Sequence, residues 1–134
     1  MIYTKEILSK YKNIALVGAS KDLNKTSSVV MKYLQKSGFK IYPVNPSMKN
    51  EKILEENVFE KISDIKGPVE IVNVFRPSSE AEEIAKEAVK IGAKVLWLQL
   101  DIKNTKAKKI AEANDILYIE DKCTKIEFDK YFKK

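Results

Sequence analysis

Short runs of apolar residues alternate along the chain with segments whose apolar positions repeat at helical spacing. The apolar runs predict five strands, at 14–17, 39–44, 70–75, 94–98 and 116–119. The segments with helical spacing predict helices at 4–11, from Thr26 or Ser27 to 37, from about 77 to 91, and at 104–114. Residues 47–66 are irregular, with a short extended piece at 53–54 and a short helix at 59–65, and the tail 121–134 shows no clear period.

Strands and helices in this order predict an α/β fold. Strands that are almost continuously apolar are typical of a parallel sheet covered on both faces. We therefore expect one doubly wound, Rossmann-like domain over residues 1–134, with its core at about 10–128. Its five-stranded sheet should be mainly parallel, with helices on both faces.

The loops that follow the strands are the expected ligand site, because doubly wound sheets bind ligands outside the carboxyl ends of their strands. These five loops should face one crevice: Gly18-Ala19-Ser20, Asn45-Pro46, Phe75-Arg76-Pro77, Gln99-Leu100-Asp101 and 120–122.

The loop after the first strand is the strongest single signal. A small-residue turn leading into a helix N-terminus is typical of a phosphate site. A nicotinamide fingerprint has three glycines, whereas only Gly18 is present and Ser20 stands at the second position. Asn45-Pro46 replaces the carboxylate that would hold the ribose of NAD, which argues against that cofactor. The alternative is a plain strand-to-helix connection whose Ser or Thr caps the helix.

The charge distribution does not predict a further binding site. The net charge is +6, but the lysines are spread over nearly every segment among 19 carboxylates, which indicates a solvated lysine-rich surface and no nucleic-acid partner. Of the 25 basic residues, Arg76 is the one arginine. Its planar guanidinium suits two alternatives, contact with a phosphate or a salt bridge to Glu80 or Glu82.

The expected compartment is the cytoplasm. The sequence has no apolar run of membrane-spanning length, and its first 13 residues do not resemble a secretory signal. Cys123 is the one cysteine, so it has no disulfide partner within the chain, which agrees with a reducing compartment.

Five motifs stand in the order and spacing of a known family: Gly18-Ala19-Ser20, Val44-Asn45-Pro46, Val74-Phe75-Arg76, Trp97-Leu98-Gln99-Leu100 and the run 121–127. Together they resemble the small stand-alone coenzyme A-binding proteins. The fold of this family resembles the N-terminal, coenzyme A-binding domain of the succinyl-CoA synthetase alpha subunit. The resemblance covers about residues 10 to 128.

The resemblance implies the following ligand contacts. The nucleotide end of coenzyme A would lie across Gly18, Ala19 and Ser20 and the helix start at Thr26 and Ser27. Asn45-Pro46 and the loop to Lys49 would lie near the adenosine and its phosphates. Phe75 and Arg76 would flank the adenine or the pyrophosphate, and Gln99 and Leu100 would border the pantetheine. Lys25 stands where the family often has an arginine, and Asp101 where it often has glycine.

Catalysis is not predicted. The related synthetase passes phosphate through a histidine, and this chain has none. Cys123 has lysines nearby but no histidine as general base, and a packed side chain is the simpler interpretation. No metal-ligand spacing is visible.

We therefore expect non-catalytic binding of coenzyme A or an acyl-CoA, as a metabolic sensor or carrier. The alternatives are a nucleotide- or NAD(P)-dependent enzyme, or an acyl-CoA-dependent transferase that needs a partner. A nucleotide-like small molecule is the expected partner, with no nucleic acid and no membrane. A homodimer or an unidentified protein partner stays open.

Overall fold

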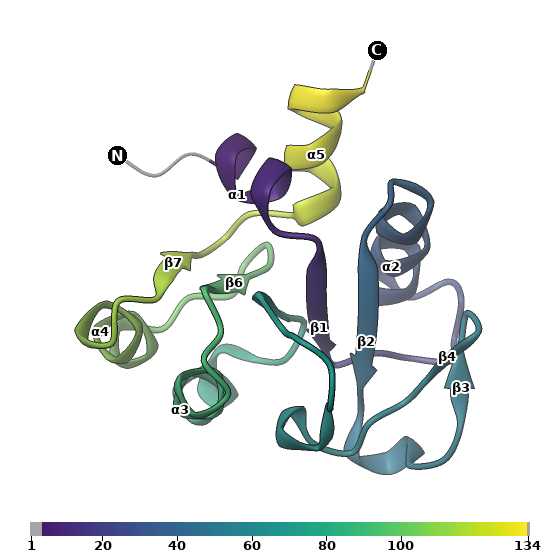
Figure 1. Cartoon of the computed structure of the whole chain (residues 1–134), viewed down its shortest axis with the longest axis horizontal. Helices are drawn as coiled ribbons and strands as arrows, with labels where there is room; N and C mark the ends of the chain where they lie inside the picture. The colour runs from purple at the N-terminus through teal and green to yellow at the C-terminus, as the bar shows by residue number, and fades with distance from the viewer. Residues whose placement is uncertain (1–3, 134) are drawn as a thin grey trace.

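A five-stranded parallel sheet forms the middle layer of the computed structural model, which describes residues 4–133 (Figure 1). The strands are β1 (Asn13–Val17), β2 (Lys40–Val44), β5 (Ile71–Val74), β6 (Val95–Leu98) and β7 (Leu117–Ile119). Their order across the sheet is β2-β1-β5-β6-β7, and all four neighbouring pairs are parallel. The order therefore reverses between β1 and β5, where a doubly wound sheet opens a ligand crevice.

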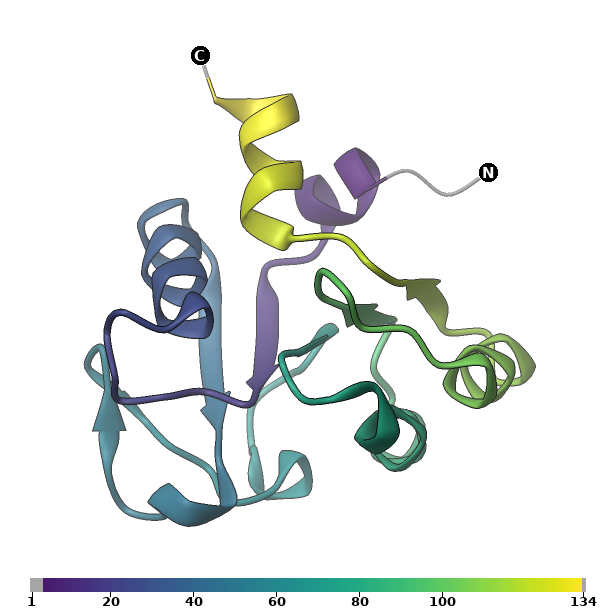
Figure 2. The ribbon, with the colours of Figure 1, turned by 180° about the vertical axis from the view of Figure 1, so that it is seen from behind.

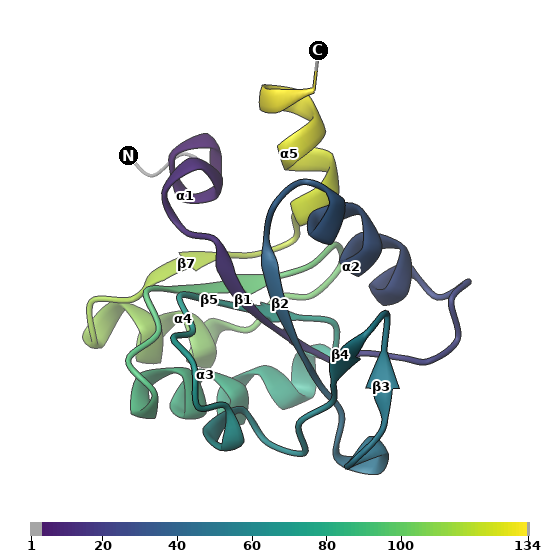
Figure 3. The same cartoon turned by 45° about the vertical axis from the view of Figure 1, so that its right-hand side comes forward.

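Helices cover both faces of the sheet (Figure 3). One face carries α1 (Thr4–Lys10), α2 (Thr26–Lys36) and α5 (Thr124–Phe132), and the other carries α3 (Ala81–Lys90) and α4 (Thr105–Ala113). Strand β1 shows why both faces are covered. Ile14 and Leu16 pack into the core beneath α2, while Ala15 and Val17 pack beneath α3. The predicted doubly wound α/β fold is confirmed; residues 1–3 and 134 of the predicted domain lie outside the described residues.

The irregular region 45–66 connects β2 to the second half of the sheet. It holds two single turns of 3-10 helix, η1 (Pro46–Met48) and η2 (Ile62–Asp64), and a small antiparallel hairpin of β3 (Lys52–Ile53) and β4 (Glu56–Asn57). The expected helix at 59–65 is thus one 3-10 turn. Leu54 and Glu55 turn the hairpin with positive φ angles of 47° and 71°, so the extended piece ends at Ile53.

Two helices differ from the sequence-based expectation. The helix expected from residue 77 begins as a 3-10 turn, η3 (Ser78–Glu80), and continues as α3. Helix α5 was not predicted at all, because its apolar positions do not form one stripe: Ile126 is 51% exposed while Phe128 and Phe132 stack on each other. It packs against α1 and α2 (Figure 2). The Thr4 hydroxyl donates a hydrogen bond to the Glu127 carboxylate.

None of the helices within residues 4–133 is both long and apolar enough to cross a membrane.

Candidate functional site

The turn after β1 is held against the end of β2. The backbone N–H groups of Gly18 and Ala19 both donate to the carbonyl of Val44, at 3.0 and 3.2 Å. Gly18 has a φ of +97°, a conformation that residues with a Cβ rarely adopt. A Cβ at this position would lie 3.0 Å from Cδ of Arg76 and 3.0 Å from the carbonyl oxygen of Phe75. Glycine is therefore required both by the backbone and by the close approach of the third loop.

Asn45 joins the first two loops. Its Nδ2 donates to the carbonyl of Ala19 at 2.8 Å, and its Oδ1 accepts from the N–H of Ser47 at 2.8 Å, which caps η1. Its own N–H donates to the carbonyl of Phe59 at 2.9 Å. The Asn45 side chain thus uses its polar atoms to position the loops, and Pro46 follows as the first residue of η1.

The N-terminus of α2 faces the same space. Its first turn contains no acidic residue, and within the described chain the Lys25 side chain makes no capping hydrogen bond. The hydroxyl of Ser28 donates instead to the carbonyl of Ser20 at 2.7 Å, which fixes the loop to the helix. The positive end of the helix macrodipole therefore has no counter-charge of its own, the arrangement that favours an anion.

A cavity of about 830 Å³ opens between these loops and α3. Ligand cavities in proteins commonly measure about 300–1,000 Å³, so this volume lies within the range of small-molecule sites. Ten of the predicted site residues line it: Gly18, Ala19, Ser20, Lys25, Thr26, Ser27, Asn45, Pro46, Phe75 and Arg76.

Three other predicted residues lie elsewhere. Lys49 lines a neighbouring cavity of about 590 Å³, which shares Glu60 and Lys61 with the first. Among the described residues, Gln99 and Leu100 belong to the lining of neither cavity. Leu100 is 51% exposed. Their assignment to the pantetheine stays a prediction.

Gln99 points into the protein rather than toward the cavity. Its Nε2 donates to Oδ1 of Asn73 at 2.6 Å and to Oγ1 of Thr124 at 3.0 Å, and Asn73 Nδ2 donates to the same Oγ1 at 3.2 Å. All three side chains are buried. This polar triad joins β5, the end of β6 and the start of α5.

The cavity also has an acidic wall, which the sequence reasoning missed except for Glu80. Glu80, Glu83 and Glu87 lie along η3 and α3, and all three line the cavity. Burial, and next the nearby Glu83 carboxylate, raise the pKa of Glu87 above its usual value. The spacing of three and four residues places them on one helix face, which is the signal that could have identified them. Glu60 and Lys61, from the loop before η2, complete that side.

Arg76 lies between the turn at Gly18 and this wall. Its Nε donates to Oε1 of Glu80 at 3.1 Å, and its Nη2 to Oε2 at 2.7 Å. The hydrogen bonds from Arg76 lower the pKa of Glu80. Of the two roles considered for Arg76, the salt bridge to Glu80 is present, and the same guanidinium borders the cavity.

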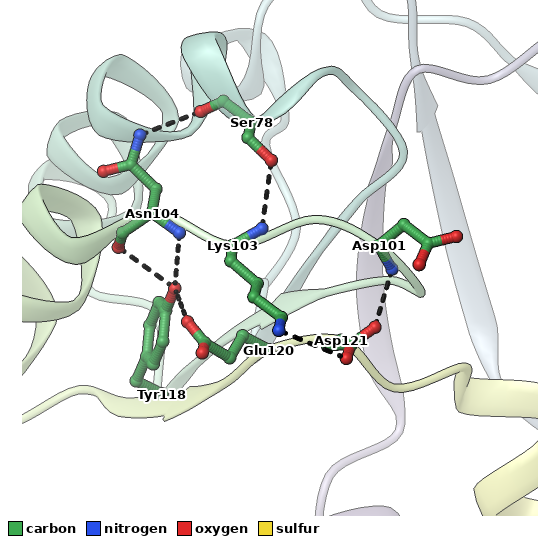
Figure 4. A network of polar contacts seen from close by, with 7 residues as sticks. All are labelled: Ser78, Asp101, Lys103, Asn104, Tyr118, Glu120 and Asp121. Atoms are coloured by element: carbon green, nitrogen blue, oxygen red, sulfur yellow. Dashed lines mark hydrogen bonds and ion pairs between the residues drawn. The ribbon is translucent and has the colours of Figure 1, made fainter.

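A polar network fixes the remaining two loops (Figure 4). The N–H of Asp101 donates to Asp121 Oδ1 at 2.7 Å, and Lys103 N–H donates to the hydroxyl of Ser78 at 3.0 Å. Asn104 caps α4 through Ala107 N–H, and its Nδ2 donates to the carbonyl of Ser78. Asp101 has a φ of +68°, which explains why glycine suits this position.

Tyr118 provides a test of this network. Burial, and next the hydrogen bond to Glu120 at 2.8 Å, raise the pKa of Tyr118 above its ordinary value of about 10. Because the folded state keeps the phenol neutral while the unfolded state ionises, the stabilisation by Tyr118 is complete below about pH 10 and is lost as the pH rises further. We expect Tyr118→Phe to lower the free energy of unfolding by about 1 kcal/mol at pH 8, through the lost hydrogen bonds.

Urea unfolding of both proteins from pH 8 to 11 measures the effect. The difference between them should shrink above about pH 10, whereas the lysines titrate equally in both. A difference that is constant over this range would contradict the assignment.

Cys123 belongs to the apolar core beside α5, with 7% of its surface exposed. The prediction of a packed side chain is confirmed. Within residues 4–133, no three His, Cys, Asp or Glu side chains are grouped so that they could hold a metal ion.

Comparison with known proteins shows similarity to one family and to several individual proteins. The family described as "CoA binding domain" matches residues 12–129. An uncharacterized protein of Bacillus subtilis, YneT, is 36% identical over 91% of this chain and 89% of its own length. A solved structure of a hypothetical protein from Pyrococcus horikoshii superimposes with a TM-score of 0.91 at 35% identity, and covers 95% of this chain and 88% of that one.

A longer protein shares the same region. The ADP-forming acetate–CoA ligase of Methanocaldococcus jannaschii is 28% identical over 69% of this chain. The matched segment is 13% of the ligase's length. The similarity therefore concerns one part of that protein.

Proposed function

This chain belongs to the CoA binding domain family, and from that premise we propose that it binds coenzyme A or an acyl-CoA in the cavity at the carboxyl edge of the sheet. The observation that carries the proposal is the convergence of ten predicted contact residues on one cavity of about 830 Å³. The phosphates would meet the uncapped N-terminus of α2 and the loop at Gly18. Lys25, Thr26 and Ser27 supply a cation and two hydroxyl groups there.

We further propose that binding is not followed by a reaction in this chain alone. The sequence has no histidine, and Cys123 is enclosed by apolar side chains instead of facing the cavity. A sensor or carrier of the coenzyme needs only reversible binding. Charge-assisted hydrogen bonds contribute about 1.5–3 kcal/mol each, so three or four suffice for micromolar affinity, about 8 kcal/mol. We place this role in the cytoplasm, since a free thiol fits a reducing compartment.

Thermal unfolding in the presence of three ligands tests the proposal. Saturating coenzyme A should raise the melting temperature by several degrees, because a ligand at 100 times its Kd stabilises the folded state by about 2.7 kcal/mol. NAD and ATP should raise it less. The loop has one of the three fingerprint glycines, and Asn45 stands where a carboxylate would hold the ribose of NAD.

Calorimetric titration with coenzyme A and acetyl-CoA then gives the Kd values. Equal shifts for all three nucleotides, or no shift for any, would refute specific coenzyme A binding. Turnover of acetyl-CoA by the purified protein, followed as release of free thiol, would refute the non-catalytic role.

A further inference from the structure

We propose that Glu80 is a built-in competitor for the ligand: its carboxylate holds the guanidinium of Arg76, and the phosphate of the ligand takes that guanidinium only when the pair opens. This inference rests on the proposed function and adds a residue that sets affinity. Glu80 would therefore weaken binding although it lines the site.

The geometry of the pair supports competition. The carboxylate of Glu80 accepts two parallel hydrogen bonds from Arg76, at 3.1 and 2.7 Å, which is the fork that a phosphate would use. Both side chains line the cavity. Arg76 is the one arginine of the chain, so there is no second guanidinium to replace it.

The position of Arg76 limits where its guanidinium can go. A Cβ on Gly18 would lie 3.0 Å from Cδ of Arg76, so the arginine stem lies directly over the turn at Gly18. A phosphate bound at this loop would be within reach of the head group without movement of the stem. The guanidinium has only to exchange one oxygen pair for another.

The pair can open at little cost. The side chains of Arg76 and Glu80 are 47% and 45% exposed, and exposed ion pairs contribute little to stability. Once released, the Glu80 carboxylate can turn into water. Without Arg76 the Glu80 carboxylate is not stabilised at the cavity, since Glu83 and Glu87 already place negative charge on the same side.

A double-mutant cycle measured by calorimetric titration with coenzyme A tests the inference. Glu80→Gln should lower the Kd about twofold to fivefold, because an amide holds the guanidinium less tightly than a carboxylate and exposed ion pairs contribute at most about 1 kcal/mol. Arg76→Ala should raise the Kd at least about tenfold. In the Arg76→Ala protein, adding Glu80→Gln should change the Kd by less than about twofold, since there is no guanidinium left for Glu80 to hold.

Glu83→Gln is the matched control. Glu83 lines the same cavity and carries the same charge, but it accepts a hydrogen bond from Lys86 at 3.0 Å. Its neutralisation removes only through-space repulsion, and the Kd should fall by less than about twofold at 0.15 M salt. Thermal unfolding of the free variants confirms that each is folded.

The outcomes separate the two proposals. If Glu80→Gln tightens binding equally with and without Arg76, or no more than Glu83→Gln does, the effect is general repulsion and the competitor role is overturned while coenzyme A binding stands. If none of the proteins binds coenzyme A, the proposed function is overturned and this inference with it.

Discussion

Replacing Gly18 by alanine is expected to weaken coenzyme A binding by more than about 100-fold, which corresponds to about 2.8 kcal/mol. The added Cβ would meet Arg76 Cδ and the Phe75 carbonyl oxygen at 3.0 Å, at a φ of +97°. Relief of these contacts moves the first and third loops apart. The positive φ adds about 1–2 kcal/mol of strain in the folded protein. Calorimetric titration gives the affinity, and urea unfolding gives the stability.

Gly38 provides a matched control for the backbone strain. It also has a φ of +97°, but a Cβ there would meet no atom within 4 Å, and it lies at the opposite end of α2 from the cavity. Gly38→Ala should therefore lower stability by the strain alone and leave the Kd within about twofold. An equal loss of affinity in both variants, or none in Gly18→Ala, would contradict the assignment of this turn to the binding site.

Replacing Thr124 by valine is expected to lower the free energy of unfolding by about 2–4 kcal/mol. Valine keeps the shape of threonine but removes Oγ1, the acceptor of the hydrogen bonds from Asn73 and Gln99. Both amides are buried, at 0% and 4% exposure, so water cannot replace the lost acceptor. Each unsatisfied buried group costs about 1–3 kcal/mol. Urea unfolding at pH 7 measures the loss.

Thr105→Val is the control, because Thr105 is an exposed residue at the start of α4. It should change stability by less than about 0.5 kcal/mol. A loss below about 1 kcal/mol in Thr124→Val would show that the triad does not hold β5, β6 and α5 together. The same variant also tests Gln99: if the folded Thr124→Val protein lost more than about tenfold in coenzyme A affinity, the triad would act on the ligand.

The sequence predicted the strands and the first three loops of the site, because apolar runs and small-residue turns each have one common structural role. Apolar runs bounded by turns predicted all five strands of the sheet, and the small-residue turn at Gly18 led to the cavity. Arg76 stood out because it is the one arginine. The predicted contact residues that meet at the cavity come from the loops after the first three strands of the sheet and from the start of α2.

Other features depend on tertiary contacts that periodicity does not report. Gln99 and Asn45 are both polar residues after a buried strand, yet one points into the core and the other joins two loops. Helix α5 buries Phe128 and Phe132 only partly, against neighbours from α1 and α2, so it shows no continuous stripe. The acidic wall was missed because Glu83 and Glu87 are also what a solvated helix face would contain.

The hydrogen bonds of Asn45 affect both the rate at which a ligand can bind and the conformational entropy that is lost when it binds. Since its amide already joins Ala19 to the cap of η1, the turn after β1 is fixed by hydrogen bonds in the protein without ligand. Little conformational entropy is left for the ligand to remove from this turn, and association need not wait for a loop to close. The free and occupied backbones at this edge of the sheet should then superimpose within about 1 Å.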